Sequence, residues 1–534
     1  MKARRACRLG SILFNFELQN NVLNLFHNSV FATSKAYYHP RAVAPVKQSL
    51  NSSEFFDAHQ VLDEESDWNV VSATTLLGQF SHSKRHMEVI YLYKRILELD
   101  VRPNEFTFGT VIPSSTTLKD LNLGKQLHGH ATKTGLASNV FVGSAILSLY
   151  SKLSTIEEAQ RVFEDTCDPN VVSYTTLMRG YIDKSRFDDA RTIFRAMPER
   201  NVVSWNAMIS GYSQKGHNEE AVNLFIEMLR EDSVPDQCTF PCVIVAAANI
   251  AAIGMGRSFH ACAIKYVGTI GLFIANSLIS FYAKCGSMDD SVLVFNELSG
   301  KNVVSWNALI CGFAQNGRGK EATEIYNKMQ SLGLKPNSVT LLGILLACNH
   351  AGLVEEGYFY FNQARLKDPD MLKPEHYSCM VDLLSRSGRF GEAEKFIRDL
   401  PFDPGIGFWK ALLGGCQIHS NMELGEFAAQ KIMALDPEDV SSYVLLSNAH
   451  SAAERWQNVL LVRHKMLEKG LQRVPGCSWI EIQSNIHVFV TRDEKHDQSN
   501  EIYMLLWIFV KHATDFQNLF NCLHIDPVSR EMTI

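Results

Sequence analysis

His86 and Glu88 form the first arrangement in this sequence whose spacing could support catalysis. In zinc-dependent nucleobase deaminases, a His-x-Glu pair supplies a metal ligand and a proton-transferring carboxylate, and a Cys-x-x-Cys pair supplies further ligands. This sequence contains no Cys-x-x-Cys pair. We therefore interpret the His86–Glu88 spacing as a coincidence, and these residues predict no deaminase chemistry.

A second set of candidate metal ligands consists of His128 and His130, in the sequence QLHGHA, and His260 and Cys262, in SFHACA. Each pair falls at an equivalent place in a repeated stretch, so the repetition accounts for them without a zinc site. The segment 254–256, Gly-Met-Gly, lacks the third glycine and the preceding strand of a dinucleotide-binding loop. The sequence therefore predicts no metal, no cofactor and no catalytic residue.

The same four-residue stretch marks the start of several repeats. VVSW begins at Val202 and at Val303, VVSA begins at Val70, and VVSY begins at Val171. Both Val70 to Val171 and Val202 to Val303 span 101 residues. A fixed period in a long chain indicates stacked repeats, in which each repeat packs only against its neighbours.

One repeat, Val303–Asn337, predicts two short amphipathic helices. Apolar residues at i, i+3, i+4 and i+7 indicate a first helix over about 305–314, and a similar pattern indicates a second helix over about 320–330. The apolar residues are Trp306, Leu309, Ile310 and Phe313, followed by Ala322, Ile325, Tyr326 and Met329. Helices this short are not stable alone in water, so neighbouring repeats must cover their apolar faces.

The pattern VVSWNALI…G…EA…Y..M…G..PN resembles the pentatricopeptide repeat (PPR) of plant organelle proteins. The 101-residue period is similar to the triplet of P, L and S repeats (35, 35 and 31 residues) in the PLS subclass. The resemblance covers about 70–513. It implies an all-α fold, a right-handed α-solenoid of stacked helix-turn-helix repeats.

Ten repeats are predicted between residues 70 and 405, in the order P-L-S, an additional S-like repeat, and two further P-L-S triplets. They span residues 70–104, 105–139, 140–170, 171–201, 202–236, 237–271, 272–302, 303–337, 338–373 and 374–405.

The segment after residue 405 changes in character. Residues 406–475 predict paired helices with tetratricopeptide-like spacing and resemble the E1 and E2 motifs. Residues 476–513 resemble a partial E+ region, with a short β-hairpin around Ser484-Asn485 and a helix over about 496–507. Residues 514–534 form a tail that resembles no family segment. No DYW deaminase domain is recognised.

The resemblance assigns base recognition to two residues of each repeat, the fifth and the last, and base stacking to the second residue. Short polar side chains suit this task because unpaired bases expose their Watson–Crick edges. The fifth/last pairs are Thr74/Asn104, Ser144/Asn170, Thr175/Asn201, Asn206/Asp236, Asn276/Asn302 and Asn307/Asn337. The second residues are Val71, Phe141, Val172, Val203, Phe273 and Val304. The alternative is that these polar residues are only helix caps and turn residues.

By the family's rule, Thr/Asn and Ser/Asn favour A, Asn/Asp favours U, and Asn/Asn favours C or U. Four repeats lack such a pair and are left open: Gly109/Asn139, Pro241/Gly271, Leu342/Lys373 and Ser378/Gly405. The predicted RNA target, written 5′ to 3′, is A-N-A-A-U-N-Y-Y-N-N, where N is any base and Y is a pyrimidine. The family places an edited cytidine a few bases further on.

The N-terminal segment differs in charge from the rest. Residues 1–50 carry seven Lys and Arg residues and one acidic residue, which is typical of an organelle transit peptide, and residues 51–69 resemble a linker. Arginines at its start favour the mitochondrion, with the chloroplast as the alternative. Removing residues 1–50 changes the net charge from −6 to −12. Phosphate attraction alone would not hold so acidic a protein on RNA. The scattered cysteines and the lack of a long apolar run predict free thiols and no membrane span.

The resemblance thus predicts a non-catalytic, sequence-specific single-stranded RNA-binding protein. Its role would be to recognise sites of C-to-U RNA editing and to recruit, through the E region, a DYW-type deaminase or other editing factors in trans. One alternative is an organelle RNA-binding factor for splicing, transcript stability or translation. Another is a protein-binding scaffold, which would not need polar residues at the fifth and last positions.

Overall fold

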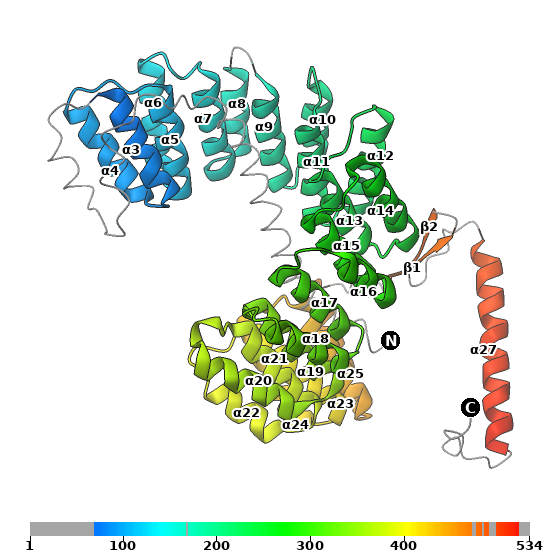
Figure 1. Cartoon of the computed structure of the whole chain (residues 1–534). Coiled ribbons are helices and arrows are strands. Elements are labelled where there is room, and N and C mark those ends of the chain that lie inside the picture. The colour runs from blue at the N-terminus through cyan, green and yellow to red at the C-terminus, as the bar shows by residue number, and fades with distance from the viewer. Residues whose placement is uncertain (1–68, 167–168, 472–476, 483–484, 491–497, 523–534) are drawn as a thin grey trace. The chain divides into compact units, whose positions relative to one another are not determined.

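The computed structural model describes residues 69–166, 169–471, 477–482, 485–490 and 498–522 (Figure 1). The predicted transit peptide, the linker and most of the C-terminal tail lie outside these residues. The chain divides into two compact bodies, one ending at Pro401 and the other beginning at Phe402. None of the helices in the described ranges combines the length and apolar character that a bilayer crossing requires.

The first body consists of ten helix pairs, which confirms the predicted α-solenoid. The first helices of the pairs are α3 (Val70–His82), α5 (Glu105–Thr117), α7 (Val140–Leu153), α9 (Val171–Asp183), α11 (Val202–Gln214), α13 (Thr239–Asn249), α15 (Leu272–Lys284), α17 (Val303–Gln315), α19 (Ser338–Ala351) and α21 (Pro374–Arg386).

The second helices of the pairs are α4 (His86–Glu98), α6 (Leu121–Lys133), α8 (Ile156–Glu164), α10 (Phe187–Ala196), α12 (Asn218–Arg230), α14 (Ile253–Val267), α16 (Met288–Glu297), α18 (Gly319–Ser331), α20 (Val354–Lys367) and α22 (Phe390–Arg398). A short 3₁₀ helix, Pro369–Met371, follows α20.

The first helices form the core of the stack because each one packs against the first helix of the next repeat as well as against its own partner. In α17, every residue from Ser305 to Ala314 is buried. In α18, only Gly319, Ala322, Tyr326 and Met329 are buried, which is one face of the helix. The predicted apolar face of the second helix therefore matches the contacts, whereas the first helix is buried on all sides rather than on one. The second helices form the outer, half-exposed layer.

Three glycines on second helices explain how the L repeats join the repeats that follow. Gly124, Gly256 and Gly357 each lie directly against a large residue of the next first helix. A Cβ added to Gly256 would stand 1.9 Å from the Phe281 ring. The segment 254–256 is thus a packing site, because a larger residue would push the Phe281 ring out of its position.

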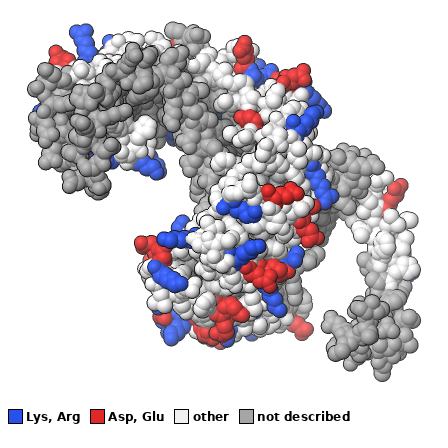
Figure 2. Space-filling model, in the orientation of Figure 1, with Lys and Arg blue, Asp and Glu red and all other residues white. Residues whose placement is uncertain are grey.

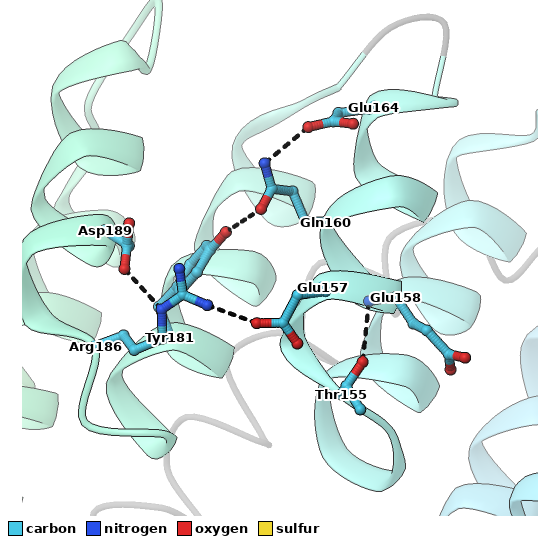
Figure 3. A network of polar contacts seen from close by, with 8 residues as sticks. All are labelled: Thr155, Glu157, Glu158, Gln160, Glu164, Tyr181, Arg186 and Asp189. Atoms are coloured by element: carbon cyan, nitrogen blue, oxygen red, sulfur yellow. Dashed lines mark hydrogen bonds and ion pairs between the residues drawn. The ribbon is translucent and has the colours of Figure 1, made fainter.

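Ion pairs between consecutive second helices recur along the stack. Figure 3 shows one of them, between Arg186 and Glu157. Arg186 at the start of α10 contacts Glu157 of α8 at 2.8 Å and Asp189 at 2.7 Å, and the Tyr181 hydroxyl donates to Gln160 at 2.7 Å. Arg389 and Glu355 form the same kind of pair at 2.7 Å. Exposed pairs of this kind stabilise a fold by about 0–1 kcal/mol each, so they fix the register of neighbouring repeats more than they stabilise them.

The second body begins with two further helix pairs, α23 (Ile406–His419) with α24 (Met422–Leu435), and α25 (Val440–Ala452) with α26 (Trp456–Glu468). Strands β1 (Cys477–Ile482) and β2 (Asn485–Val490) then pair antiparallel, with Ile482 opposite Asn485, which is the predicted hairpin. Helix α27 (Ser499–Cys522) differs from the prediction of a helix over 496–507. It begins three residues later and continues past residue 513, where the sequence resemblance fades.

Replacing Gly256 with Ala should destabilise the protein by about 1–3 kcal/mol, because the added methyl group overlaps the Phe281 ring in a close-packed interface. The matched control is Gly129→Ala in α6, the corresponding helix of another L repeat, where nothing lies within 4 Å of the added Cβ. The control should be neutral or stabilising by up to about 1 kcal/mol, because alanine favours helix. Urea unfolding midpoints of the two variants test this, and equal midpoints would contradict the packing role of Gly256.

Candidate nucleic-acid interface

The last residue of five of the six predicted pairs is the N-cap of the next first helix, and Asp236 lies two residues before the N-cap of α13. The side-chain Oδ1 atoms of five asparagines accept the backbone N–H three residues further on, at 2.9–3.1 Å. These are Asn104, Asn170, Asn201, Asn302 and Asn337. The capping role that the sequence offered as an alternative is therefore present. It occupies one end of each amide and fixes how the side chain is oriented.

Capping leaves a defined group on each of these side chains. The Nδ2 group of each capping asparagine donates no hydrogen bond to the described residues, so an N–H donor remains. Asp236 differs because its Oδ1 accepts from the backbone N–H groups of Cys238 and Thr239, both at 2.9 Å. Its Oδ2, which is an acceptor only, forms no hydrogen bond with the described residues. The last position thus offers a donor in five repeats and an acceptor in one.

The fifth residues of three repeats are asparagines that packing almost completely buries. Asn206, Asn276 and Asn307 are 2%, 3% and 1% exposed. Asn206 donates through Nδ2 to Asp236 Oδ1 at 3.0 Å, and Asn307 donates to Asn337 Oδ1 at 3.0 Å. The structure therefore joins the fifth and last residues directly in these two pairs.

Two of these buried asparagines keep an unused acceptor. The Oδ1 atoms of Asn206 and Asn276 are buried without a hydrogen-bond partner. Asn307 has no such atom, because Thr340 Oγ1 lies 2.6 Å from its Oδ1 and donates to it. Leaving a buried acceptor unsatisfied costs about 1–3 kcal/mol, so an unsatisfied acceptor in a native protein calls for an explanation.

The pairs with a hydroxyl at the fifth position are joined less directly. Thr74 Oγ1 lies 3.3 Å from Thr107 Oγ1, which in turn donates to Asn104 Oδ1 at 2.9 Å. Thr175 Oγ1 donates to the carbonyl of Val171 within its own helix. Ser144 Oγ is buried without a partner. The structure thus does not join Thr175 or Ser144 to the last residue of its pair.

The third residue of each following repeat is a part of the site that the sequence analysis missed. In the L repeats it is Thr107, Thr239 or Thr340, whose hydroxyl lies 2.9 Å from the Oδ1 of the preceding capping residue. A Ser or Thr three residues after each Asn or Asp was visible in the sequence. These hydroxyls help to hold the last residue in one orientation.

The second residues of the first helices are exposed although they are apolar. Val71, Phe141, Val172, Val203 and Phe273 are between 38% and 65% exposed, and Val304 is half-buried. Phe106 is 59% exposed at the second position of the first L repeat. Sequence reasoning omitted Phe106, although its position matches that of Phe141 and Phe273. A large apolar side chain kept exposed at one position in several repeats is typical of a contact surface.

Figure 2 shows one face of the molecule, on which Lys and Arg are interspersed with Asp and Glu over the described residues and form no single basic patch. In the described part of the chain, no group of three or more His, Cys, Asp or Glu side chains could hold a metal ion.

The repeats without a suitable pair also lack an amide at the fifth position. A Cβ added to Gly109 would meet nothing within 4 Å, and Pro241 is buried within α13.

His376 takes the place of the capping hydroxyl in the tenth repeat. Its Nδ1 accepts the backbone N–H of Lys373 at 3.0 Å, so Nε2–H donates to the carbonyl of Ser338 at 2.8 Å. The ring is 1% exposed, and burial lowers the pKa of His376 although the backbone hydrogen bonds oppose this shift. Acceptance at Nδ1 needs the neutral ring, whereas Nε2–H can donate in either protonation state.

The unfolded chain therefore binds a proton at His376 at a higher pH than the folded chain does. Stability from this residue is present above the unfolded pKa of about 6.5 and is lost as the pH falls below it. We expect the melting temperature to fall between pH 7 and pH 5, and to fall less steeply in His376→Gln, which keeps an acceptor for Lys373 N–H. Identical pH slopes in the two proteins would contradict this role.

Comparisons with known proteins agree with this architecture. Residues 200–249 and 301–350 match the PPR repeat family, residues 172–202, 273–303 and 375–401 match the PPR repeat, and residues 419–481 match the E motif. In solved structures, the fold is similar to that of the pentatricopeptide repeat protein PPR10 in complex with an 18-nt psaJ RNA element. That match has a TM-score of 0.60 and 17% identity, and covers 79% of this chain and 63% of that one.

Curated relatives come from Arabidopsis thaliana. The pentatricopeptide repeat-containing protein At5g42450, mitochondrial, is 56% identical over 92% of this chain and 96% of its own length. At2g03880, mitochondrial, is 35% identical over 84% of this chain, and At2g13600 is 40% identical over 85%. The chain spans 65% and 66% of the lengths of these last two proteins. With identity at this level over nearly the whole chain, the protein belongs to the pentatricopeptide repeat family.

Proposed function

We propose that this protein binds single-stranded RNA in an organelle, recognises its sequence through the fifth and last residues of its repeats, and acts as a site-recognition factor for C-to-U editing. The observation that carries the proposal is the set of six fifth/last pairs in which one atom is fixed by capping or packing and another is left unpaired. Six such pairs distributed over eight stacked repeats suit an extended polymer of bases better than a compact ligand.

The unpaired groups differ in the way that bases differ. Uracil presents an N3–H donor at its Watson–Crick edge, whereas cytosine presents an N3 acceptor and an amino group. The free Oδ2 of Asp236 suits the uracil donor, and the free Nδ2 of Asn302 or Asn337 suits an acceptor. The buried Oδ1 atoms of Asn206 and Asn276 would gain a partner from a base donor after a small shift.

The exposed second residues supply the apolar part of the site. Valine and phenylalanine at this position offer flat or compact apolar surfaces against which base faces can stack, at about 1–3 kcal/mol per base for aromatic side chains. A net charge of −6 makes these base contacts more important than phosphate attraction. The predicted target remains A-N-A-A-U-N-Y-Y-N-N, and Phe106 adds a stacking contact at its second position.

The comparisons support an organelle and an RNA ligand. PPR10, whose fold is similar, was solved with RNA, and two of the relatives above are named as mitochondrial. Another relative, At3g49170, which is 36% identical over 84% of this chain, is named as chloroplastic. We propose the mitochondrion for this protein, with the chloroplast as the alternative.

The deaminase is supplied in trans, through the E region. Helix α26 has an outward face with four large apolar residues that are 60–71% exposed: Trp456, Leu460, Leu461 and Leu467. Of its residues, only Val459 is buried. The last helix of a stack normally carries a polar outer face, so this apolar face indicates a protein partner. The partner that we propose is a DYW-type deaminase-bearing editing factor.

Binding to two short single-stranded RNAs tests base recognition. One RNA carries A-N-A-A-U-N-Y-Y-N-N, and in the other the specified A and U positions are exchanged. We expect at least a ten-fold preference for the first, about 1.4 kcal/mol. In Asp236→Asn, the free acceptor becomes a donor, so the fifth base of the string should change from U to C preference. Asn421→Asp, at the N-cap of α24, is the control and should change nothing.

Equal affinity for the two RNAs would contradict base recognition and would favour a protein-binding scaffold. If RNA binding is specific but transcripts carrying the site change in length or abundance, with editing intact, in a plant lacking the protein, then the function is splicing, stability or translation.

Substitutions on α26 test the partner surface. Leu460→Glu combined with Leu467→Glu should abolish co-purification of the deaminase-bearing factor and lower editing at the site, because two charges would be buried in the contact. RNA affinity should stay unchanged. Lys465→Glu alters the net charge by the same amount on the same helix and should retain the partner. Partner binding that survives the double substitution would rule out this face.

A further inference from the structure

The first helix pair of the second body contains a further copy of the fifth/last arrangement. Lys410 is the fifth residue from the start of α23, and Asp439 is the last residue before α25 and its N-cap. Lys410 Nζ lies 2.7 Å from Asp439 Oδ1. In the same way, Asn206 Nδ2 lies 3.0 Å from the Oδ1 atom of Asp236. The E1 segment has therefore kept the geometry of the proposed base-contacting pairs.

The two acids differ in what remains available. In Asp439, Oδ1 accepts from Lys410 and lies 3.0 Å from Ser441 Oγ, and Oδ2 accepts from Ser441 Oγ at 2.7 Å and from the Ser442 backbone N–H at 2.9 Å. In Asp236, all the described hydrogen bonds go to Oδ1. Asp439 thus has partners on both oxygens, whereas Asp236 keeps one oxygen unpaired.

The opposite charges of Lys410 and Asp439 strengthen the contact between them. An ammonium–carboxylate contact is a charge-assisted hydrogen bond, and the side chains are only 34% and 14% exposed. Burial by itself raises the pKa of Asp439, but the hydrogen bonds from Lys410 and Ser441 outweigh it, so the pKa is lowered. A base that competed for Asp439 would have to break an ion pair, whereas at Asp236 it would only displace water.

The residue at the stacking position has also changed. The second residue of the helix that follows each proposed pair is apolar in most of the repeats, as in Val203 and Val304. In α25 it is Ser441, whose hydroxyl is directed to Asp439 rather than left as an apolar surface. Lysine at the fifth position is a donor only and cannot separate bases by donor and acceptor.

We propose that Lys410 and Asp439 form a closed counterpart of the base-contacting pairs, which leaves the E1 segment without sequence preference. The inference rests on the proposed RNA function. It assigns Lys410 and Ser441 as the residues that keep Asp439 from contacting a base.

Opening the pair tests the inference. The double variant Lys410→Asn, Ser441→Val reproduces the Asn–Asp pair of Asn206 and Asp236 with an apolar second residue, and frees Asp439 for a base N–H. The probe is a series of RNAs that carry A-N-A-A-U-N-Y-Y-N-N and a tail whose next four positions are each set to U or C in turn. The variant should gain at least a ten-fold preference for U at one tail position, whereas the wild-type protein should show none.

Three controls separate the outcomes. Lys410→Asn alone keeps the Ser441 and Ser442 contacts of the α25 cap and should gain a smaller preference at the same position, which keeps the test available if the double variant is unstable. Lys465→Asn, exposed on α26, should gain nothing. Exchange of the A and U positions in the string reports, in every variant, whether the repeats themselves recognise bases.

A wild-type protein that distinguishes the exchanged strings, together with variants that gain no tail preference, would overturn the closure and leave the proposed function intact. A wild-type preference at a tail position that Lys410→Asn abolishes would also overturn it, because the pair would then be recognising a base. Loss of all discrimination by the wild-type protein would overturn the proposed function and this inference with it.

Discussion

The hydrogen bond from the start of a first helix to the last side chain of the preceding repeat, which most of the described repeats contain, is the contact on which the rest of the structure depends. It satisfies a backbone N–H that would otherwise have no partner in a buried helix end. It also joins two repeats, because the capping residue belongs to one repeat and the helix to the next. The same bond orients the free end of each Asn or Asp, so the stacking of repeats and the placement of the polar groups have one cause.

The two helices of each repeat differ in burial, and therefore in the role that each one has in the structure. The first helices are enclosed by their neighbours, which leaves little freedom for Asn206, Asn276 and Asn307. The second helices are covered on one face only, and glycines such as Gly256 let the next first helix approach closely. Rigid placement of a polar pair requires this division, because side chains on a half-exposed helix would sample several rotamers.

Much of this could be predicted from the sequence, since period and apolar spacing determine the stack. The start of α17 was predicted at Ser305 but lies at Val303, because the cap and the packing outweigh the low helix propensity of valine. The end of α27 was predicted at about Trp507 but lies at Cys522, since no family pattern extends there. The burial of Asn206 arises from contacts between helices and has no signal within one repeat. Phe106 could have been predicted, because it is the second residue of its repeat, as Phe141 and Phe273 are.

The unsatisfied acceptors show why similar pairs need not contribute equally. Asn206 and Asn276 each keep a buried Oδ1 without a partner, at a cost of about 1–3 kcal/mol, whereas Thr340 satisfies the corresponding atom of Asn307. A base that donates to the first two atoms removes an existing cost, whereas a base at Asn307 must replace a hydrogen bond already made. The free energy that a base gains at each repeat therefore depends on the hydrogen bonds of the third residue of the next repeat as well as on the pair itself. At Asp439 both oxygens already accept hydrogen bonds, so a base would gain least there.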